Sequence, residues 1–155
     1  MPTRKIAFDT NVVGPLLAHY GLQILEGVKR QEWEVYLPII VYAEQAVWRG
    51  DTANAVVDAF GAQVIPLDRR HVETLGKMWN TLRARPRPGE RPTDLWRRHK
   101  CDWLIAAMAK QEGWLLVSDD TDFQRIQGEV DLQVMRLDEF IQQHLAPALA
   151  NGGRL

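Results

Sequence analysis

The sequence predicts an α/β fold of three layers, in which a central parallel sheet of about five strands carries helices on both faces. Short apolar segments of strand character alternate along the chain with longer segments in which apolar residues recur every three or four positions. Such alternation favours parallel strands, because each crossover between them needs a helix. With 155 residues, 46% of them hydrophobic, the chain is long enough for one substantial core. We therefore expect one domain over residues 1–150 and a flexible tail over residues 151–155.

The first half of the chain is expected to supply three strands and three helices. Asp9, Thr10 and Asn11 separate the first strand from its helix, because these residue types favour turns and helix N-caps. Pro38 suits the first position of a helix, and Gly61 suits the end of one. The expected order is strand 5–8, helix 12–30, strand 34–37, helix 39–49, helix 51–60 and strand 63–67.

The second half begins with a helix and is then interrupted by an unusual segment. Residues 85–92 hold three prolines and three arginines, a density of proline that predicts an irregular loop. Around this loop we expect helix 69–83, a helix from about residue 99 to residue 113, strand 114–117, strand 132–135 and a last helix over 137–149.

The charge of the chain is close to balanced but unevenly distributed. Nineteen basic and twenty acidic residues give a net charge of −1, which argues against a nucleic-acid binder that works through overall positive charge. Residues 83–100, here called the basic segment, hold seven basic and two acidic residues and so carry +5. The rest of the chain therefore carries −6. A local basic surface remains compatible with the near-neutral total.

The cysteine count and the hydropathy indicate the compartment. Cys101 is the single cysteine, so no intrachain disulfide can form. No apolar run approaches the roughly 20 residues of a membrane span. We expect a cytoplasmic protein with no membrane partner.

Acidic residues follow two of the expected strands directly. Asp9 ends the apolar run of residues 6–8, and Ser118, Asp119 and Asp120 follow the run of residues 115–117. In open parallel sheets the functional site lies beyond the carboxyl ends of the strands. Taken alone, Asp9 is also compatible with a helix N-cap, and the later acids with a solvated turn.

Two further acids interrupt apolar helix faces. Glu44 lies within the helix expected over 39–49, where it has no capping role, and Asp102 precedes the apolar run of residues 103–107. Asp102 is also compatible with an acid that complements a helix dipole. If these carboxylates converge with Asp9 and Asp120, they repel one another strongly unless a cation lies among them. Oxygen ligands of this kind suit Mg²⁺ or Mn²⁺.

Four stretches of the chain together resemble the PIN domains, and among them the VapC-type toxins of bacterial type II toxin–antitoxin pairs. They occur in the family's order and at compatible spacing, and the resemblance extends to about residue 145. The stretches are Phe8-Asp9-Thr10-Asn11-Val12-Val13, Val41-Tyr42-Ala43-Glu44, Cys101-Asp102-Trp103-Leu104-Ile105-Ala106-Ala107 and Leu116-Val117-Ser118-Asp119-Asp120-Thr121-Asp122-Phe123.

The resemblance implies a PIN-like three-layer fold and a metal-dependent endoribonuclease. It assigns catalytic and metal-binding roles to Asp9, Glu44, Asp102 and Asp120, with Asp122 as a fifth ligand of one or two Mg²⁺ or Mn²⁺ ions. Metal-activated water would hydrolyse the phosphodiester bond and leave a 5′-phosphate and a 3′-hydroxyl.

The same resemblance assigns supporting roles, and the chain departs from the family at two points. Asn11 and Ser118 would lie behind the ligands, with Ser118 at a position where the family more often has Thr. The helix that carries Glu44 usually opens with Ser or Thr, whereas this chain has Leu37-Pro38. The proline- and arginine-rich stretch is also longer than in minimal members.

An acidic site needs basic groups nearby to attract RNA. The basic segment leads directly into the helix that holds Asp102. We therefore predict that it contacts RNA phosphates and that Trp96 stacks on a base, although a solvated surface loop is the competing interpretation. The residues concerned are Arg85, Arg87, Arg91, Arg97, Arg98 and Trp96.

The last expectations concern the partners of the protein and its alternative functions. The resemblance implies a cognate antitoxin and a homodimer, with apolar positions on the early helices as its face. One alternative is a PIN-like RNA-binding or scaffold protein without catalysis. Another is a receiver- or phosphatase-like α/β domain, which would need a positioned Lys or an Asp two residues after Asp9. The four histidines show no metal-ligand spacing and are interpreted as ordinary surface or half-buried residues.

Overall fold

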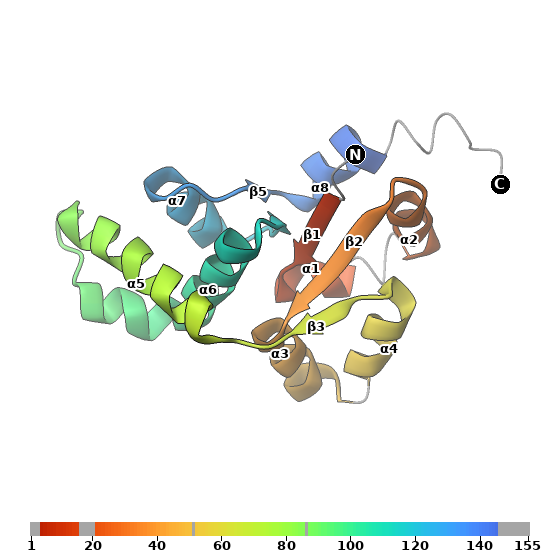
Figure 1. Cartoon of the computed structure of the whole chain (residues 1–155), viewed down its shortest axis with the longest axis horizontal. Helices are drawn as coiled ribbons and strands as arrows, with labels where there is room; N and C mark the ends of the chain where they lie inside the picture. Colours follow the sequence, from red (N-terminus) through yellow and green to blue (C-terminus); the bar gives the residue numbers. More distant parts are fainter. Residues whose placement is uncertain (1–3, 16–20, 51, 86, 146–155) are drawn as a thin grey trace.

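The computed structural model describes residues 4–15, 21–50, 52–85 and 87–145. Its centre is a sheet of five parallel strands in the order β3-β2-β1-β4-β5 (Figure 1). Their bounds are β1 (Arg4–Phe8), β2 (Trp33–Pro38), β3 (Gln63–Ile65), β4 (Leu115–Val117) and β5 (Val134–Met135). The predicted α/β fold with a parallel sheet and helices on both faces is confirmed.

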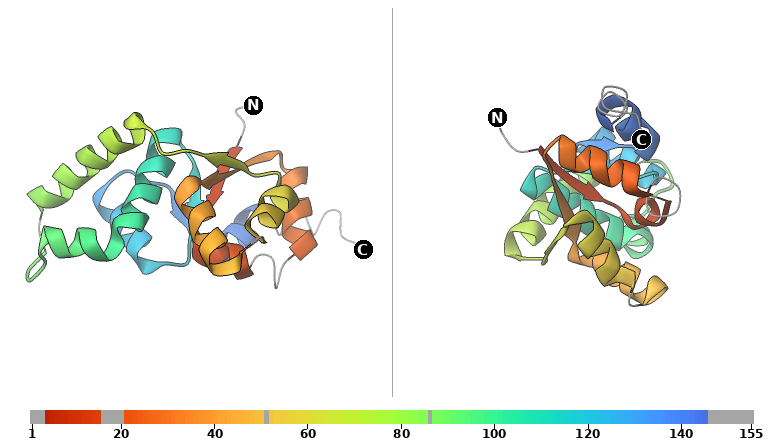
Figure 2. Two further views of the ribbon diagram at one scale, coloured as in Figure 1. Left: turned by 90° about the horizontal axis from the view of Figure 1, so that it is seen from below. Right: turned by 90° about the vertical axis from the view of Figure 1, so that its right-hand side faces the viewer.

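Helices connect the strands and cover the sheet. They are α1 (Thr10–Pro15), α2 (Gly21–Arg30), α3 (Ile39–Arg49), α4 (Thr52–Phe60), α5 (Arg69–Ala84), α6 (Pro92–Glu112), α7 (Thr121–Glu129) and α8 (Leu137–Phe140), followed by the π-helical segment η2 (Ile141–Leu145). The long helices α5 and α6 lie side by side and project beyond the sheet (Figure 2). Among the described residues, no helix has both the length and the apolar character needed to cross a membrane.

Several expected boundaries need correction. Pro38 is the last residue of β2 rather than the first of α3, because its φ of −55° and ψ of 139° continue the extended strand. The helix expected over 12–30 is seen as α1 and α2, and residues 16–20 between them lie outside the described residues. Strands β3 and β5 are shorter than predicted. The expected tail over 151–155 and the end of the last helix also lie outside the described residues.

The largest error concerns the proline-rich stretch. Helix α6 begins at Pro92, seven residues before the predicted start near His99. Proline is tolerated there because the first helical residue has no intrahelical partner for its N–H. The backbone of His99 (φ −127°, ψ 19°) bends α6, so the segment predicted from about residue 99 is the second arm of a kinked helix. Helix α7 was not predicted at all, since the acids before it indicated only a turn.

The core lies between the central strands and the helices that cover them. Ile6, Ala7 and Phe8 of β1 are buried completely or almost so. Phe140 of α8 packs edge-on against Phe8, with ring centroids 6.3 Å apart, and against Trp33, at 5.6 Å. This aromatic contact anchors the C-terminal helix to the strand that leads to Asp9.

The aromatic contact generates the first prediction. Replacing Phe140 with Ala removes a fully buried ring that contacts both β1 and β2, so it should destabilise the fold by about 3–5 kcal/mol. Urea denaturation followed by circular dichroism measures the loss. The exposed neighbour Glu139 provides the matched control, and Glu139→Ala should change stability by less than about 0.5 kcal/mol. Equal losses in both variants would contradict this account of the core.

Candidate metal centre

The candidate metal centre lies at the carboxyl ends of the two central strands. Strands β1 and β4 pair in parallel, and their last partners in register are Phe8 and Val117. Asp9 follows one strand and Ser118 the other, so the register brings these two residues together. The backbone N–H of Asp9 continues the ladder by donating to the carbonyl of Val117 at 3.0 Å.

Asp9 is buried and held by two hydrogen bonds. Only 4% of the residue is exposed. Its Oδ2 accepts from the hydroxyl of Ser118 at 2.8 Å, and its Oδ1 accepts from the backbone N–H of Thr10 at 2.8 Å. Both oxygens are therefore oriented by neighbouring residues.

Helix α3 adds Glu44 to the site through Thr10. The Thr10 hydroxyl donates to Glu44 Oε2, and the buried side chain of Gln45 donates its Nε2 to the Thr10 carbonyl at 3.3 Å. Gln45 Oε1 is buried without a hydrogen-bond partner among the described residues. A buried acceptor without a partner is uncommon in folded proteins.

Asp120 enters the site as the N-cap of α7. Its Oδ1 accepts from the N–H of Asp122 at 2.9 Å, and its own N–H donates to Ser118 Oγ at 3.1 Å. Ser118 thus links Asp9 to Asp120. Asp119 instead accepts from the N–H of Leu137 at 3.0 Å, so it ties the loop to α8.

Helix α6 supplies Asp102 and, at its bend, His99. The Nδ1 atom of His99 lies 2.9 Å from Asp122 Oδ2 and 3.5 Å from Asp102 Oδ2. One ligand atom from each of the three side chains lies within 4.8 Å of the other two, close enough to hold one cation. His99 is half-buried, as expected from the sequence, but it also lies against two of the predicted ligands, which the sequence interpretation did not anticipate. Its position three residues before Asp102, on one helix face, was the available signal.

The acids perturb one another strongly. Burial, with smaller contributions from the charges of Glu44 and Asp120, raises the pKa of Asp9 from 3.8 to about 6. Burial, followed by the charges of Asp120, Asp9 and Asp122, raises the pKa of Asp102 from 3.8 to about 7. Negative charge at this site is thus unfavourable without a cation. The clustered carboxylate oxygens fit a divalent cation.

The structure brings five of the predicted residues into one acidic cluster and leaves another outside it. We call the group Asp9, Glu44, Asp102, Asp120 and Asp122 the acidic cluster. The side chain of Asn11 is exposed on α1 and makes no hydrogen bond to a described residue, so its supporting role stays a prediction. Sequence reasoning missed Thr10, Gln45 and His99. Thr10 and Gln45 are direct neighbours of Asp9 and Glu44, which was the only signal they carried.

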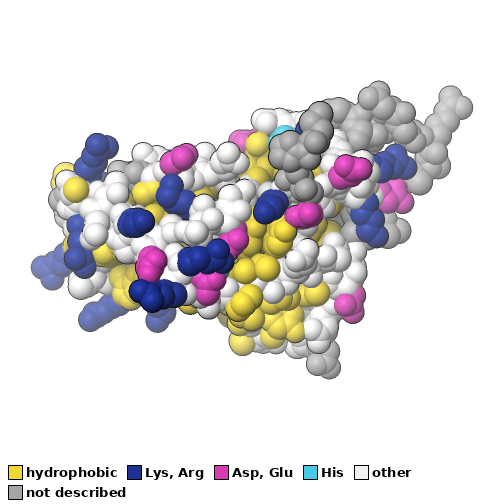
Figure 3. All heavy atoms as spheres, in the orientation of Figure 1, with side chains coloured by type: hydrophobic (Ala, Val, Ile, Leu, Met, Phe, Trp, Pro, Cys, Tyr) yellow, Lys and Arg dark blue, Asp and Glu magenta, His cyan; other side chains and the backbone are white. Residues whose placement is uncertain are grey.

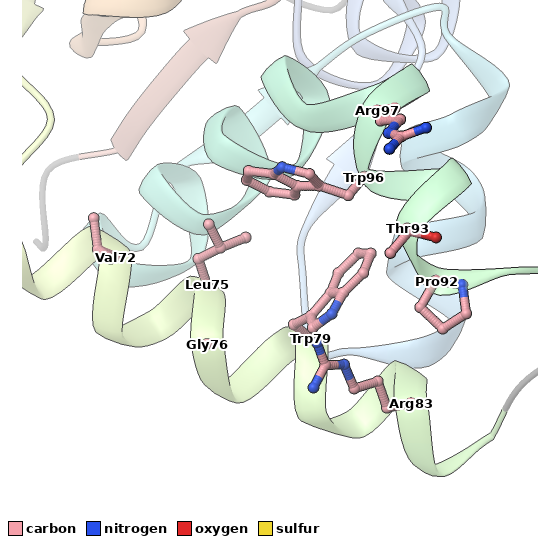
Figure 4. Close-up of a pocket in the computed structure, with 9 residues that line it drawn as sticks. All are labelled: Val72, Leu75, Gly76, Trp79, Arg83, Pro92, Thr93, Trp96 and Arg97. Carbon is pink, nitrogen blue, oxygen red and sulfur yellow. The ribbon is translucent and has the colours of Figure 1, made fainter.

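The predicted RNA-contacting residues separate into three groups. Figure 3 shows basic side chains gathered over the end of the molecule that α5 and α6 form. Trp96 and Arg97 line an apolar cavity of about 440 Å³ between these helices, where Trp96 packs edge-on against Trp79 at 6.0 Å (Figure 4). Arg91 and Arg98 line a different cavity, next to His99. Arg85 and Arg87 are exposed in the connection between the helices. RNA contact by these residues stays a prediction.

A second group of possible ligands has a structural explanation. His71 is fully buried, and its Nδ1 accepts from the N–H of Asp68 at 3.0 Å as part of a capping box on α5. Its Nε2 lies 2.8 Å from Glu112 Oε1. Both ring nitrogens are engaged, so this group joins α5 to the end of α6 rather than offering a ligand.

Comparisons with known proteins agree with this fold. The family described as PIN domain matches residues 6–129. A structure of VapBC2 from Rickettsia felis, bound to a DNA fragment from its promoter, matches at 16% identity with a TM-score of 0.61, over 85% of this chain and 98% of that one. A structure of VapBC-1 from nontypeable Haemophilus influenzae matches at 22% identity with a TM-score of 0.56, over 85% and 97%. At these identities the similarity establishes the fold. No curated protein matched the chain.

The family match covers the part of the chain that builds the site. It includes the last three residues of β1 and all of α3, α6, β4 and α7, and therefore every residue of the acidic cluster. The match and the geometry of the sheet agree, and we conclude that the chain belongs to the PIN-domain family.

Proposed function

We propose that the protein is a cytoplasmic, Mg²⁺- or Mn²⁺-dependent endoribonuclease, and that it acts as a VapC-like toxin of a type II toxin–antitoxin pair. The observation that carries the proposal is the convergence of four elements on one acidic cluster, in which burial and mutual repulsion raise the pKa values of Asp9 and Asp102. A site of this kind is unfavourable by itself and becomes favourable around a cation.

The residues of the cluster have distinct parts in the proposed reaction. Ser118 and Thr10 hold Asp9, and Thr10 also holds Glu44, so two carboxylates from different elements keep a fixed relation. The hydrogen bond from the N–H of Asp122 orients Asp120. One or two bound metal ions would lower the pKa of a water molecule and stabilise charge on the leaving oxygen. Asp9, Glu44, Asp102 and Asp120 would hold the metal, with Asp122 as a fifth ligand.

RNA is the proposed substrate because basic residues lie beside the acidic cluster, and basic residues attract a polyanion. The basic segment forms the connection between α5 and α6 and the first arm of α6, which ends at the bend beside Asp102. Its arginines would offset the repulsion between the acidic cluster and a polyanion. Support for RNA in particular comes from the likeness to VapC-type toxins.

Two protein partners belong to the proposal. The similar structures are VapBC complexes, which supports a cognate antitoxin as a partner of this chain. A homodimer is supported by the apolar surface of α3, where Val47 and Trp48 are 82% and 81% exposed. Burial of these side chains against a second copy would remove them from water.

The function is tested by removing a proposed ligand and by withholding the metal. Asp9→Asn should lower the rate of Mg²⁺- or Mn²⁺-dependent cleavage of single-stranded RNA by more than about 100-fold, because it replaces a metal-binding oxygen. Ser118→Ala keeps every proposed ligand but removes the two hydrogen bonds that link Asp9 to the N–H of Asp120, so it should lower the rate by about 10–100-fold. Gel analysis of the labelled products measures both rates.

Two other outcomes of this experiment would count against the proposed function. Cleavage that persists in EDTA, or in Asp9→Asn, would contradict the proposed mechanism. RNA binding without any cleavage under either metal would favour the scaffold interpretation instead.

The raised pKa values predict how the metal-free protein responds to pH. Because the pKa of Asp102 is about 7 in the folded protein and ordinarily 3.8, the folded state binds more protons than the unfolded state between these values. The stability that the protonated carboxyl contributes is therefore present below about pH 4 and is lost as the pH rises through about 7. Asp102→Asn removes this titration.

The measurement is a comparison of melting temperatures in EDTA. The melting temperature of Asp102→Asn minus that of the wild type should rise between pH 4 and pH 8, by about 3 °C or more. Added Mn²⁺ should stabilise the wild type at pH 8 and the variant far less. A difference that stays constant with pH, or equal stabilisation by Mn²⁺, would disprove this explanation.

A further inference from the structure

A polar cavity adjoins the acidic cluster on the side of the helix bend. It has a volume of about 350 Å³ and is formed by the connection that precedes α6, the first arm of α6 and α7. Three arginines and two acids line it together with His99, namely Arg91, Arg98, Arg125, Glu90 and Asp94. We call this cavity the arginine pocket.

His99 connects the arginine pocket to the acidic cluster. Its side chain lines the pocket, and its Nδ1 lies 2.9 Å from Asp122 Oδ2. Arg125 follows Asp122 by three residues on α7, so the two side chains lie on the same face of the helix, one turn apart. A polyanion lying across α7 would therefore meet the acidic cluster and the arginine pocket in succession.

Arg125 has hydrogen-bonding capacity that the protein does not use. Its terminal nitrogen donates to Glu90, and both side chains of this pair are 21% exposed. Its Nε is buried and has no hydrogen-bond partner among the described residues. A guanidinium presents its donors in a fork that matches two oxygens of one phosphate, whereas a single carboxylate oxygen leaves part of that fork unused.

The other groups of the pocket favour an anion. The side chains of Arg91 and Arg98 have no ion-pair or hydrogen-bond partner among the described residues, and both residues are exposed. Asp94 opposes them but is also exposed, so water screens its charge. In the part of the chain that the structure describes, only Glu90 places a carboxylate against the half-buried Arg125. The pocket therefore already holds one anionic group, in the position where another could bind.

We propose that the arginine pocket binds a backbone phosphate of RNA next to the scissile one, and that Glu90 occupies Arg125 until this phosphate displaces it. The inference rests on the proposed function, because it assigns a subsite to the same RNA. Displacement is feasible because the phosphate would replace the Glu90 carboxylate on a mostly buried guanidinium and so leave no charge unpaired, and because Glu90 lies in the connection between two helices rather than within one. Glu90 thus lowers the affinity for RNA, while Arg125 raises it.

Substitutions of Arg125 and Glu90 should then change the affinity for RNA in opposite directions. Arg125→Gln should weaken the binding of a short labelled single-stranded RNA by about tenfold or more. It should also reduce the slope of log K against log salt by about 0.7, the value for one phosphate contact on a single strand. Glu90→Gln should tighten binding roughly threefold or more, because it removes the competing carboxylate.

Fluorescence anisotropy with Mg²⁺ measures these affinities, with every variant made in Asp9→Asn so that the RNA stays intact. The matched control is the Arg69–Glu73 pair on α5, whose arginine is 91% exposed and lines no part of the pocket. Arg69→Gln and Glu73→Gln should leave affinity within about twofold.

A neutral methylphosphonate next to the scissile position should weaken binding to the parent protein and cause no further loss in Arg125→Gln.

Each outcome decides between the claims. Unchanged affinity in Arg125→Gln, or weaker binding in Glu90→Gln, overturns the inference and shows that the pair only joins the loop to α7. If the chain with Asp9 intact still cleaves RNA in that case, the proposed function stands. If that chain neither binds nor cleaves RNA with Mg²⁺ or Mn²⁺, the proposed function fails and the inference fails with it.

Discussion

The pairing of β1 with β4 is the constraint on which the site depends. These strands are separated by more than a hundred residues of sequence, yet their register ends at Phe8 and Val117. The residues that follow are therefore neighbours, and Ser118 can donate to Asp9 on one side and accept from the N–H of Asp120 on the other. A shift of one residue in this register would move Asp9 away from Ser118 and reverse the faces of the strand. The tight burial of residues 6–8 opposes that shift, because it would move the charged Lys5 or Asp9 into positions packed within the core.

The strand register brings several carboxylates close together, and their mutual repulsion has an energetic cost. Asp9 is buried beside Glu44 and Asp120, and Asp102 beside three further carboxylates, so ionising either is unfavourable. Hydrogen bonds from Ser118 and Thr10 partly offset the effect at Asp9, and the position of His99 partly offsets it at Asp102. The repulsion that these contacts do not offset is the source of the affinity that we propose for a divalent cation. The same features make the ionised site energetically unfavourable in the absence of a cation.

The bend of α6 gives one helix two uses. Its second arm packs Ile105, Ala106 and Ala107 into the core and holds Asp102 at the cluster, while its first arm turns away with α5 and carries the arginines. His99, at the bend, lies between the acidic cluster and the arginine pocket. The near-neutral net charge of the chain is therefore the sum of a basic end and an acidic centre, and His99 lies between the two. This arrangement accounts for an acidic site in a protein that we propose binds RNA.

The order and type of most elements, and the identity of the acids, could be predicted from the sequence because both depend on local patterns. Apolar runs of strand length and helical periodicity are short-range signals, and Asp9, Glu44 and Asp102 stand out because each interrupts such a run. The start of α6, helix α7 and the parts played by Thr10, Gln45 and His99 could not be predicted in this way. Proline indicates a loop as readily as a first helical turn, and a threonine, glutamine or histidine acquires its role only from what lies opposite it. Hydrogen bonding and charge act over a few ångströms in space, whereas the residues that share them here lie up to 109 positions apart in the chain. The sequence thus determined which groups could perform chemistry, and the tertiary structure decided which of them meet.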